Sequence, residues 1–381
     1  MKALIIGCGI AGPVTAMALR EVGVDAEIFE AYDEGSEGVG TFLNLASNGL
    51  AALRVLGAHR KVLDKAIPTP RMVMWSGTGK RLGEVANGLR LDDGTVSHTV
   101  LRSDLYRGIR DEAEQRGIKV RYGKRLVSYD ESTGQVTARF EDGTEATGDL
   151  LIACDGVHSR TRSILDPQAP APRYSGLYSF GGIVKDGGLT GEPGVYNMIF
   201  GKRAFFGYTV AESGETWWFA NLPRRLGDVP ASWKPELVRA FEDDANASAE
   251  VIGRSDAGLG SPIYDLPPVP VWHRGRALLL GDAAHATSPS AGQGASLAVE
   301  DAVVLAKCLR DSGDHREAFA RFEAERRPRV ERVVAYSRTI SNSKAAGPVA
   351  RVFRDLMLPI FLKRSASQES LAWMYRYQAG L

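Results

Sequence analysis

Short apolar runs alternate with helical patterns at the start of the chain. Lys2–Ile6 predicts a buried strand, Pro13–Val22 a helix rich in Ala, Leu and Met, and Ala26–Phe29 a second strand. A Gly-rich loop, Gly35–Gly49, then leads into a predicted helix at Leu50–Leu56. A strand, a helix and another strand in this order indicate a βαβ unit.

Two later apolar runs, Leu150–Ala153 and Ala277–Leu280, also predict buried strands. The first leads into Asp155-Gly156 and a predicted helix, and the second ends in Gly281-Asp282. A proline and two glycines follow that second pair. An amphipathic run that starts near Gly294 then predicts a helix whose N-terminus faces the loop.

The segment Pro170–Gly260 has a different pattern, because aromatic residues recur there between Gly-containing turns, which predicts strands. Arg71–Ser97 predicts an earlier visit to a sheet, and Val136–Glu145 alternates around Asp-Gly as a hairpin does. The pattern from Leu297 onward is helical. The predicted helices are Glu300–Asp311, His315–Arg326 and Val330–Ser343.

The pattern as a whole predicts an α/β fold, in which a Rossmann-like domain is interleaved with a β-sheet-rich domain and followed by C-terminal helices. Three prolines in Leu266–Pro270 mark a rigid crossover between the two domains. The expected first domain comprises residues 1–70, 98–169 and 264–343, the second 71–97 and 170–263, and the C-terminal segment 344–381.

The glycines after the first strand have the spacing G-x-G-x-x-G, at Gly7, Gly9 and Gly12. Between a strand and a helix, this spacing lets backbone N–H groups approach a pyrophosphate at the positive end of the helix. Glu30 follows the second strand about 20 residues later, where an acid holds an adenosine ribose. These residues predict a site for the ADP half of a dinucleotide.

The second Gly-rich stretch, residues 281–294, indicates the same cofactor from its other end. Asp282 can accept hydrogen bonds from ribitol hydroxyls. The glycines let backbone N–H groups and a helix N-terminus approach the electron-rich pyrimidine edge of a reduced flavin. The two stretches together predict a site for FAD.

Three motifs in this order, G-x-G-x-x-G, Asp155-Gly156 and G-D-A-A-H-x-x-x-P-x-x-G-Q-G, resemble those of the single-component (class A) flavoprotein monooxygenases of the para-hydroxybenzoate hydroxylase type. The resemblance covers residues 1–327 and is weakest over 172–260. It implies an enzyme that uses FAD and NAD(P)H to insert one oxygen atom from O2 into a small to medium aromatic or unsaturated organic substrate. The route would be a flavin hydroperoxide, with hydroxylation or epoxidation as the outcome.

Other reactions remain open at this point. Within the class they are Baeyer–Villiger insertion, oxidative decarboxylation and antibiotic inactivation. Outside it they are an FAD-dependent dehydrogenase or reductase without oxygen insertion, and a flavin-binding protein that has lost turnover.

The resemblance also implies the residues that hold the cofactor. Arg102 would reach the pyrophosphate from the start of a helix, with Ser103 or Asp104 as its cap, and Pro289 would shape an oxygen pocket. NADPH or NADH would bind transiently, because no second Gly-rich dinucleotide loop is present. The residues expected to bind FAD, non-covalently, are Gly7, Gly9, Gly12, Glu30, Arg102, Asp155, Gly156, Asp282, Pro289, Gly292, Gln293 and Gly294.

The aromatic strands are expected to form the wall of the substrate site. Only one face of an alternating strand can point at a ligand, so most of these aromatics must be core. The candidates for substrate contact are Phe180, Phe206, Tyr208, Phe219 and Asn221. The sequence identifies no catalytic residue, since it has no carboxylate pair and no Ser/Cys–His constellation, which fits chemistry that a cofactor supplies.

Several polar residues have plainer interpretations. His285 is expected to brace its loop rather than act as a base, and the histidines show no metal-ligand spacing. Arg160 and Arg162 could be solvated helix charges or cofactor contacts. The cysteines lie in apolar contexts and are expected to be packed, reduced thiols: Cys8, Cys154 and Cys308.

Composition limits the partners. The 47 Lys and Arg residues nearly cancel the 46 Asp and Glu residues, so neither nucleic-acid nor anionic-membrane binding gains electrostatic support. No stretch has the roughly 18 apolar residues of a membrane span, and Met1-Lys-Ala leads straight into the first strand, so we expect no signal peptide. Three unpaired cysteines favour the cytoplasm, where we expect a monomer or homodimer.

The last apolar stretch, Val352–Leu362, predicts a C-terminal helix that Pro359 should bend or end. We expect it to pack over the mouth between the two domains and restrict substrate access. A membrane-surface anchor and a plain structural brace are the alternatives.

Overall fold

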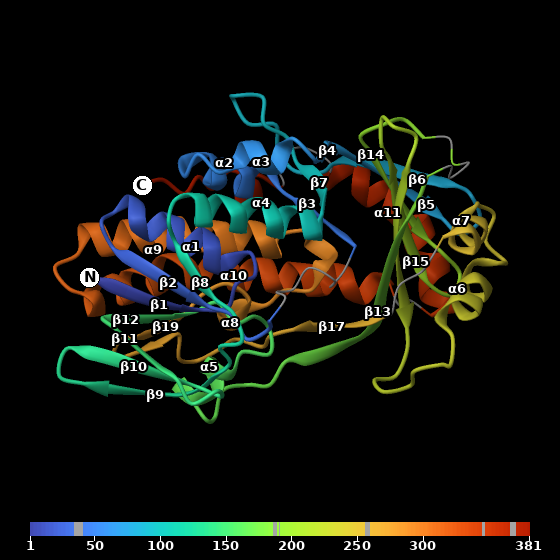
Figure 1. Ribbon diagram of the computed structural model, residues 1–381. Coiled ribbons are helices and arrows are strands. Elements are labelled where there is room, and N and C mark those ends of the chain that lie inside the picture. Colours follow the sequence, from blue (N-terminus) through green and yellow to red (C-terminus); the bar gives the residue numbers. More distant parts are fainter. Residues whose placement is uncertain (34–40, 186–188, 190, 256–259, 345–346, 366–370) are drawn as a thin grey trace.

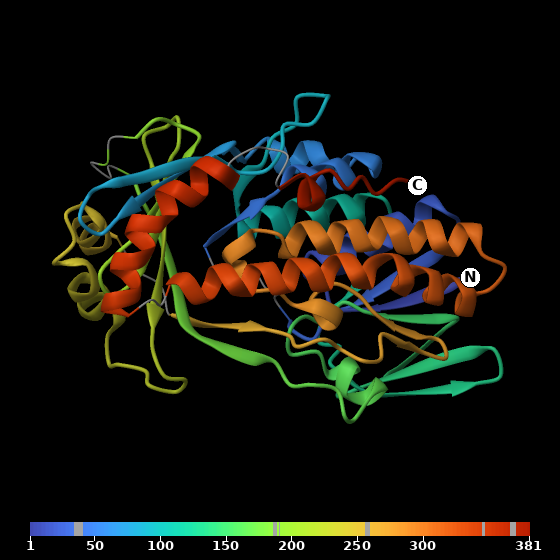
Figure 2. The same cartoon turned by 180° about the vertical axis from the view of Figure 1, so that it is seen from behind.

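The computed structural model describes residues 1–33, 41–185, 189, 191–255, 260–344, 347–365 and 371–381. Two large sheets lie toward opposite ends of an elongated molecule (Figure 1). A long helix, α10 (His315–Lys344), starts beside the first sheet and ends beside the second, as Figure 2 shows from behind.

The first sheet has six strands: β1 (Lys2–Ile6), β2 (Asp25–Phe29), β8 (Lys119–Arg121), β12 (Leu150–Ala153), β18 (His273–Arg274) and β19 (Ala277–Leu279). Their order is β18-β19-β12-β1-β2-β8, and every neighbouring pair except β18 and β19 is parallel. β12 and β19 are buried throughout, because both faces of this parallel sheet are covered.

Helices cover one face of the first sheet, where α1 (Ala11–Glu21) packs against α9 (Gly294–Asp311) (Figure 1). α9 also packs against α10 and α2 (Ser47–Val55). The remaining elements of this half are α3 (His59–Leu63), α4 (Arg102–Gln115), α5 (Arg160–Leu165), α8 (Asp282–His285), the short 3-10 helix η1 (Pro289–Ala291) and an antiparallel sheet of β9 (Leu126–Ser132), β10 (Gln135–Phe140) and β11 (Glu145–Gly148).

The second sheet has seven strands: β5 (Arg71–Ser76), β6 (Arg81–Ala86), β13 (Arg173–Val184), β14 (Val195–Phe200), β15 (Phe205–Val210), β16 (Thr216–Pro223) and β17 (Ser261–Asp265). Their order is β17-β13-β16-β15-β14-β5-β6, and only β14 and β5 pair in parallel. Two helices, α6 (Trp233–Phe241) and α7 (Ser248–Arg254), pack with one face of this sheet in a separate hydrophobic core. The α/β fold with a Rossmann-like part, a sheet-rich part and C-terminal helices is thus confirmed.

A small sheet lies between the two large ones (Figure 1). It contains β3 (Phe42–Leu45), β7 (His98–Leu101) and β4 (Ile67–Pro68), with β7 in the middle. The predicted loop Gly35–Gly49 is therefore wrong over β3, while its first part, 35–40, lies outside the described residues. The helix after it begins at Ser47, three residues earlier than predicted. Gly49 allows α2 to approach α9 closely, because a Cβ there would lie 2.5 Å from the Oγ of Ser296.

Other predicted boundaries also need correction. The sequence missed α6 and α7 within the strand-rich segment, since their short apolar stripes lie among many aromatic residues. The two helices predicted on either side of Pro328 form one helix, α10. Arginines on both sides of Pro328 anchor α10 to other elements. Arg326 binds Asp301, Arg327 donates to the carbonyl oxygen of Val269, and Arg329 binds Glu300. These contacts offset the backbone hydrogen bond that proline lacks.

The C-terminal helix α11 (Pro348–Ser365) continues past Pro359, which does not end it. α11 packs on β6, and its outer face exposes several apolar side chains: Val352, Phe353, Leu356, Met357 and Ile360. No described helix is long and apolar enough to cross a bilayer. A last short helix, α12 (Ala372–Tyr375), brings the C-terminal tail back to the core of the first sheet.

Candidate active site

Four parallel strands of the first sheet bring the predicted cofactor residues to one edge. Gly7 follows β1, Glu30 follows β2, Asp155 follows β12 and Asp282 follows β19. Because these strands are parallel neighbours, their carboxyl ends lie at the same edge of the sheet. Open α/β sheets bind ligands at this edge.

The first glycine turn combines tight packing with open space. A Cβ at Gly12 would lie 2.0 Å from the carbonyl oxygen of Gly7, so this turn leaves no room for a side chain. A Cβ at Gly9 would meet no atom within 4 Å. The N-terminus of α1 that follows has no side-chain cap. Unpaired N–H groups beside an open approach suit a pyrophosphate.

Glu30 is a buried acid beside this turn, with only 5% of its surface exposed. Its carboxylate accepts hydrogen bonds from the backbone N–H of Cys8 at 2.7 Å and of Tyr32 at 3.0 Å. Each carboxylate oxygen can accept a further hydrogen bond. Glu30 is therefore oriented by the backbone and can still receive a ribose hydroxyl.

The Asp155-Gly156 turn is held from within. One oxygen of Asp155 accepts from Ser159 Oγ at 2.5 Å, and the other accepts from the backbone and hydroxyl of Thr161. A Cβ at Gly156 would meet no atom within 4 Å. The side chain of Asp155 thus caps the start of α5, and it is Gly156 that leaves space in front of the turn.

Arg162 links two turns at the cofactor edge. Its side chain is buried, and it donates to the carbonyl oxygens of Val157 at 2.8 Å and Ala283 at 3.0 Å. The interpretation as a solvated charge is therefore wrong for Arg162, which ties the turn after β12 to the turn after β19.

Asp282 is accessible to solvent, although many protein atoms surround it. The surrounding protein raises the pKa of its carboxyl by reducing its hydration, while the nearby His285 and Arg102 oppose this shift. Arg102 begins α4 and donates to the hydroxyl of Tyr106. The expected cap of α4 by a neighbouring Ser or Asp is absent, since Leu101 occupies the N-cap position without a side-chain hydrogen bond.

The second glycine turn leads into α9. Gly292 has a φ of 61°, a left-handed conformation that favours glycine, and its carbonyl oxygen lies 3.4 Å from the amide nitrogen of Asn44 on β3. Gln293 is fully buried and accepts from Asn48 at 3.0 Å. The N-terminus of α9 has no side-chain cap, so its N–H groups can receive a polar ligand.

These observations fit FAD. The edge offers two uncapped helix N-termini, two glycines that face open space, and two acids at strand ends. This set matches a long cofactor with a pyrophosphate in its middle. Ser296, near the start of α9, accepts from the backbone N–H of Ala46 at 3.0 Å. It holds α2 against α9 and does not face the open space.

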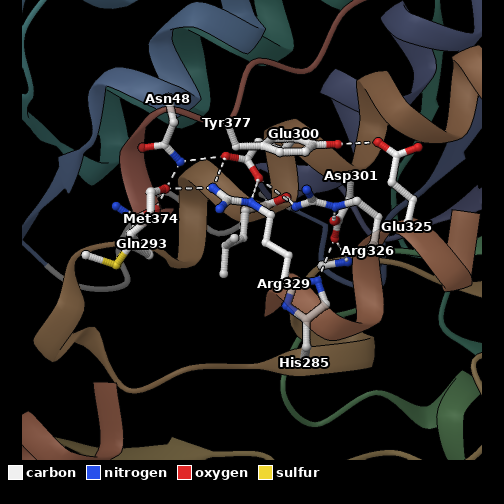
Figure 3. A network of polar contacts seen from close by, with 12 residues as sticks. Asn48, His285, Gln293, Glu300, Asp301, Glu325, Arg326, Arg329, Met374 and Tyr377 are labelled. Carbon is white, nitrogen blue, oxygen red and sulfur yellow. Dashed lines mark hydrogen bonds and ion pairs between the residues drawn. The ribbon is translucent and has the colours of Figure 1, made fainter. Parts of the chain in front are cut away.

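A buried network of charges braces the second glycine turn from behind (Figure 3). Arg326 on α10 pairs with Asp301 at 2.6 Å and with Glu300 at 2.7 Å, and all three side chains are fully buried. Arg329 also pairs with Glu300, at 2.8 Å. Asn48 donates to Glu300 as well as to Gln293. This network could not be predicted from the sequence, because its members come from segments far apart along the chain.

His285 belongs to the same network. Its Nε2 lies 2.6 Å from Asp301, and its ring packs on Trp272. Burial alone would raise the pKa of Asp301, but the neighbouring His285 and Arg326 lower it to about 2. The expectation that His285 braces its loop is confirmed. The three cysteines are free thiols, and burial raises the pKa of Cys8 to about 12.

The second sheet separates the predicted substrate residues onto two faces. Phe180 packs on Trp233, and Phe206 packs on Trp218 and Phe241, beneath α6 and α7. Tyr208 lies on this face too, since it is two residues from Phe206 on the same strand. These three residues belong to the core under the helices, so we do not retain them as substrate contacts.

Phe219 and Asn221 lie on the opposite face, toward the first sheet. Phe42 on β3 contacts Phe219, with ring centroids 6.1 Å apart, and also contacts Tyr196 and Trp217. The same strand carries Asn44, which reaches Gly292. β3 therefore joins the second glycine turn to the aromatic face, and the mostly apolar run Phe42–Leu45 was a signal that could have revealed this strand.

α10 makes a second connection that sequence reasoning missed. Ser337 donates to the carbonyl oxygen of Ser288 at 2.7 Å and accepts from the N–H of Ala291 at 3.1 Å, so it holds the turn around Pro289. Ser341, one turn later, contacts Ser290 at 3.1 Å. Pro289 itself is exposed to the accessible space.

Known proteins resemble this chain over most of its length. A family model described as FAD binding domain matches residues 1–337. The FAD-dependent urate hydroxylase of Klebsiella pneumoniae is 31% identical over 344 residues, 89% of each protein. Aurachin C monooxygenase/isomerase of Stigmatella aurantiaca is 33% identical over 354 residues, 88% of each. The crystal structure of Klebsiella pneumoniae HpxO complexed with FAD and uric acid superposes with a TM-score of 0.87 at 27% identity, and covers 98% of this chain and 97% of that one.

Proposed function

The chain belongs to the FAD-binding domain family and is an FAD-dependent monooxygenase, and from this premise we propose that its substrate lies between the cofactor edge of the first sheet and the aromatic face of the second. The substrate is a small to medium aromatic or unsaturated organic compound. NADPH or NADH supplies the electrons, and bound FAD supplies the oxygen chemistry. One atom of O2 enters the substrate as a hydroxyl or epoxide oxygen, and the other leaves as water.

The observation that carries this proposal is the convergence of the two regions. Asp282 and Gln293 stand at the cofactor edge, and β3 and α10 connect that edge to the face that bears Phe219 and Asn221. A buried apolar wall beside a flavin can hold a ring and exclude water. The urate and aurachin enzymes that the chain resembles act on ring compounds, which supports the same substrate class here.

We assign the cofactor residues by their places at this edge. The turn at Gly7, Gly9 and Gly12 binds the pyrophosphate with Arg102, and Glu30 binds the adenosine ribose. Asp282 binds ribitol. The turns at Gly156 and at Pro289, Gly292, Gln293 and Gly294 lie along the flavin ring and leave room for the nicotinamide. FAD is held without a covalent bond.

The domain division follows from these roles. We propose that residues 1–70, 98–169 and 264–343 bind FAD and that 71–97 and 170–263 bind substrate, with 344–381 as a C-terminal segment that limits access to the site. Three free thiols, two of them buried, support a reducing compartment such as the cytoplasm. A monomer or a homodimer remains the expected assembly.

The test is isotopic. FAD-loaded protein is screened with NADPH and NADH for ring compounds that accelerate nicotinamide oxidation, and the best compound is incubated under 18O2. Mass spectrometry should find one 18O atom in the product, with O2 and nicotinamide consumed in equal amounts. An oxidised or reduced product without label would indicate the dehydrogenase or reductase instead.

A further inference from the structure

Lys344 is a cation on the aromatic face of the second sheet. Its Nζ lies 4.3 Å from the ring centroid of Phe205 and 5.7 Å from that of Phe219. It donates to the amide oxygen of Asn221 at 3.1 Å. An ammonium group has three donors, and Asn221 accounts for one of them. Two N–H groups of Lys344 are therefore left for a ligand or water.

The position of Lys344 follows from the path of α10. Ser337 and Ser341 on this helix hold the turn around Pro289. Lys344 is three residues beyond Ser341, which is about 4.5 Å along a helix axis. The same helix thus contacts the flavin-side turn and then delivers an ammonium group to the wall on which Phe219 and Asn221 lie.

No carboxylate among the described residues forms an ion pair with Lys344. The side chain of Lys344 is half-buried, and its partial loss of hydration lowers its pKa to about 7. From the sheet it meets Phe205, Phe219 and Asn221, none of which carries a charge. On α11, Arg354 donates to the carbonyl oxygen of Phe200, whose ring contacts Phe205, and Arg351 donates to that of Lys202. The carboxylate beside them, Asp355, already pairs with Arg354.

An unpaired ammonium in apolar surroundings costs stability, because its lost hydration is only partly replaced. Perturbed groups of this kind are concentrated at functional sites. The two phenyl rings and one amide stabilise the cation in part. An anionic ligand would complete the set, since it would accept the remaining N–H groups and neutralise the charge.

We infer that Lys344 is the anion-binding residue of the substrate site, and that the substrate is an aromatic or conjugated compound that binds as an anion, through a carboxylate or an ionised ring hydroxyl or N–H. The inference rests on the proposed function, because it takes the face with Phe219 and Asn221 as the substrate wall. The apolar rings receive the body of the ligand, and Lys344 fixes which end of it points away from the flavin.

Matched ligand pairs test this assignment on the FAD-loaded, full-length protein. Benzoate and benzamide, and salicylate and salicylamide, share a shape and differ in charge. Each is titrated while the flavin absorbance is recorded, so binding is measured without turnover. The variants are Lys344→Met, Lys344→Arg and, as a control on an exposed lysine of α9, Lys307→Met.

We expect the wild type and Lys307→Met to bind each acid at least about tenfold more tightly than its amide, the effect of one charge-assisted contact. Lys344→Met should lose this preference through weaker binding of the acids, while the amides bind as before. Lys344→Arg should keep it. In the wild type the preference should decline as the pH rises through about 7, whereas Lys344→Arg should show no such decline.

Three results would overturn the inference: amides that bind the wild type as tightly as acids, a preference that survives in Lys344→Met, or no flavin perturbation by any acid. If Lys344→Met does not fold, the wild-type pH profile and Lys344→Arg still decide the question. Failure of the proposed function would look different, because the protein would then retain no FAD or NAD(P)H would not reduce it.

Discussion

The two ends of the site stabilise buried polar groups in opposite ways. Behind the flavin edge, Arg326 and Arg329 form ion pairs with Glu300 and Asp301, although Nη1 of Arg326 has no hydrogen-bond partner. On the aromatic face, Lys344 has one amide and two rings beside it. The charges of the first arrangement are therefore balanced without a ligand, whereas the cation of the second has no anion among the described residues.

This difference matches what each region has to do. The flavin edge must hold a permanent cofactor in one geometry, and a network of balanced charges holds the N-terminus of α9 in place. The aromatic face must accept and release a substrate, so its polar group is left incomplete. The comparison predicts that substitutions behind the flavin edge affect folding, while those on the aromatic face affect ligand selection.

The largest effect is expected for Arg326→Met. It removes a fully buried cation from beside Asp301 and Glu300, and a broken buried ion pair costs roughly 3–5 kcal/mol. Urea unfolding followed by circular dichroism should measure this loss. The control is Arg310→Ala on the exposed side of α9, whose surface pair is expected to contribute at most about 1 kcal/mol. Equal losses in the two variants would contradict the role of the network.

The glycine turn allows a matched pair of substitutions. Gly12→Ala places a Cβ 2.0 Å from the carbonyl oxygen of Gly7, so it should destabilise the fold by roughly 1–3 kcal/mol and also weaken FAD binding. Gly9→Ala meets no protein atom within 4 Å and should fold with unchanged stability within about 0.5 kcal/mol. It should nevertheless weaken FAD binding, because its methyl group enters the proposed pyrophosphate space. Normal FAD affinity in Gly9→Ala would place the cofactor elsewhere.

Asp282→Ala should weaken FAD binding without unfolding the protein. The ribitol hydroxyls lose an acceptor in a buried site, at a cost of about 1–3 kcal/mol, or about 5- to 150-fold in affinity. Fluorescence titration of FAD into flavin-free protein measures this change. Unchanged affinity would show that Asp282 does not face the ribitol.

The raised pKa of Asp282 gives a second readout on the flavin-free protein. The carboxyl of Asp282 has a higher pKa in the folded than in the unfolded protein, where it is about 3.9. Its protonation therefore stabilises the fold at pH values below the unfolded pKa, and this contribution is lost as the pH rises through the folded pKa. Asp282→Asn should therefore stabilise the flavin-free protein at neutral pH, with a gain that shrinks toward acid pH. A variant that binds FAD less well but melts higher would separate function from folding at this position.

The smallest effect is expected for the change in stability that Lys344 causes over the single pH unit above pH 7, which is at most about 1.4 kcal/mol. The pKa of Lys344 falls from 10.5 in the unfolded chain to about 7 in the folded protein, because the side chain loses hydration. The ammonium group therefore lowers the free energy of unfolding most strongly below pH 7, and this destabilisation declines as the pH rises toward 10.5. Between these values the stability of the wild type should rise relative to that of Lys344→Met. Parallel pH profiles of the two melting temperatures would show that Lys344 is not desolvated.

The sequence predicted the flavin edge well because its signals are local. Gly7, Gly9 and Gly12 stand between a strand and a helix that the apolar pattern also predicts, and Glu30 and Asp282 directly follow strands. Each of these residues takes its position from a short segment of the chain. Parallel pairing of the strands then brings the segments together.

The aromatic face was predicted only in part, since its roles depend on tertiary structure. Whether Phe206 or Phe219 faces the flavin depends on sheet register and on which face α6 and α7 cover, and neither is visible in the chain. Lys344 looks like an ordinary lysine at a helix end until Asn221 and Phe205 are seen beside it. The continuity of α10 through Pro328 likewise depends on distant partners.

A crystal structure of the FAD-loaded protein with salicylate would test most directly whether the two regions form one site. The account predicts the flavin ring between the turn of Asp282 and Gln293 and the face of Phe219, with the salicylate carboxylate within hydrogen-bonding distance of Lys344 Nζ. A flavin ring away from the second sheet, or salicylate bound on the face that Phe180 and Phe206 share, would contradict it.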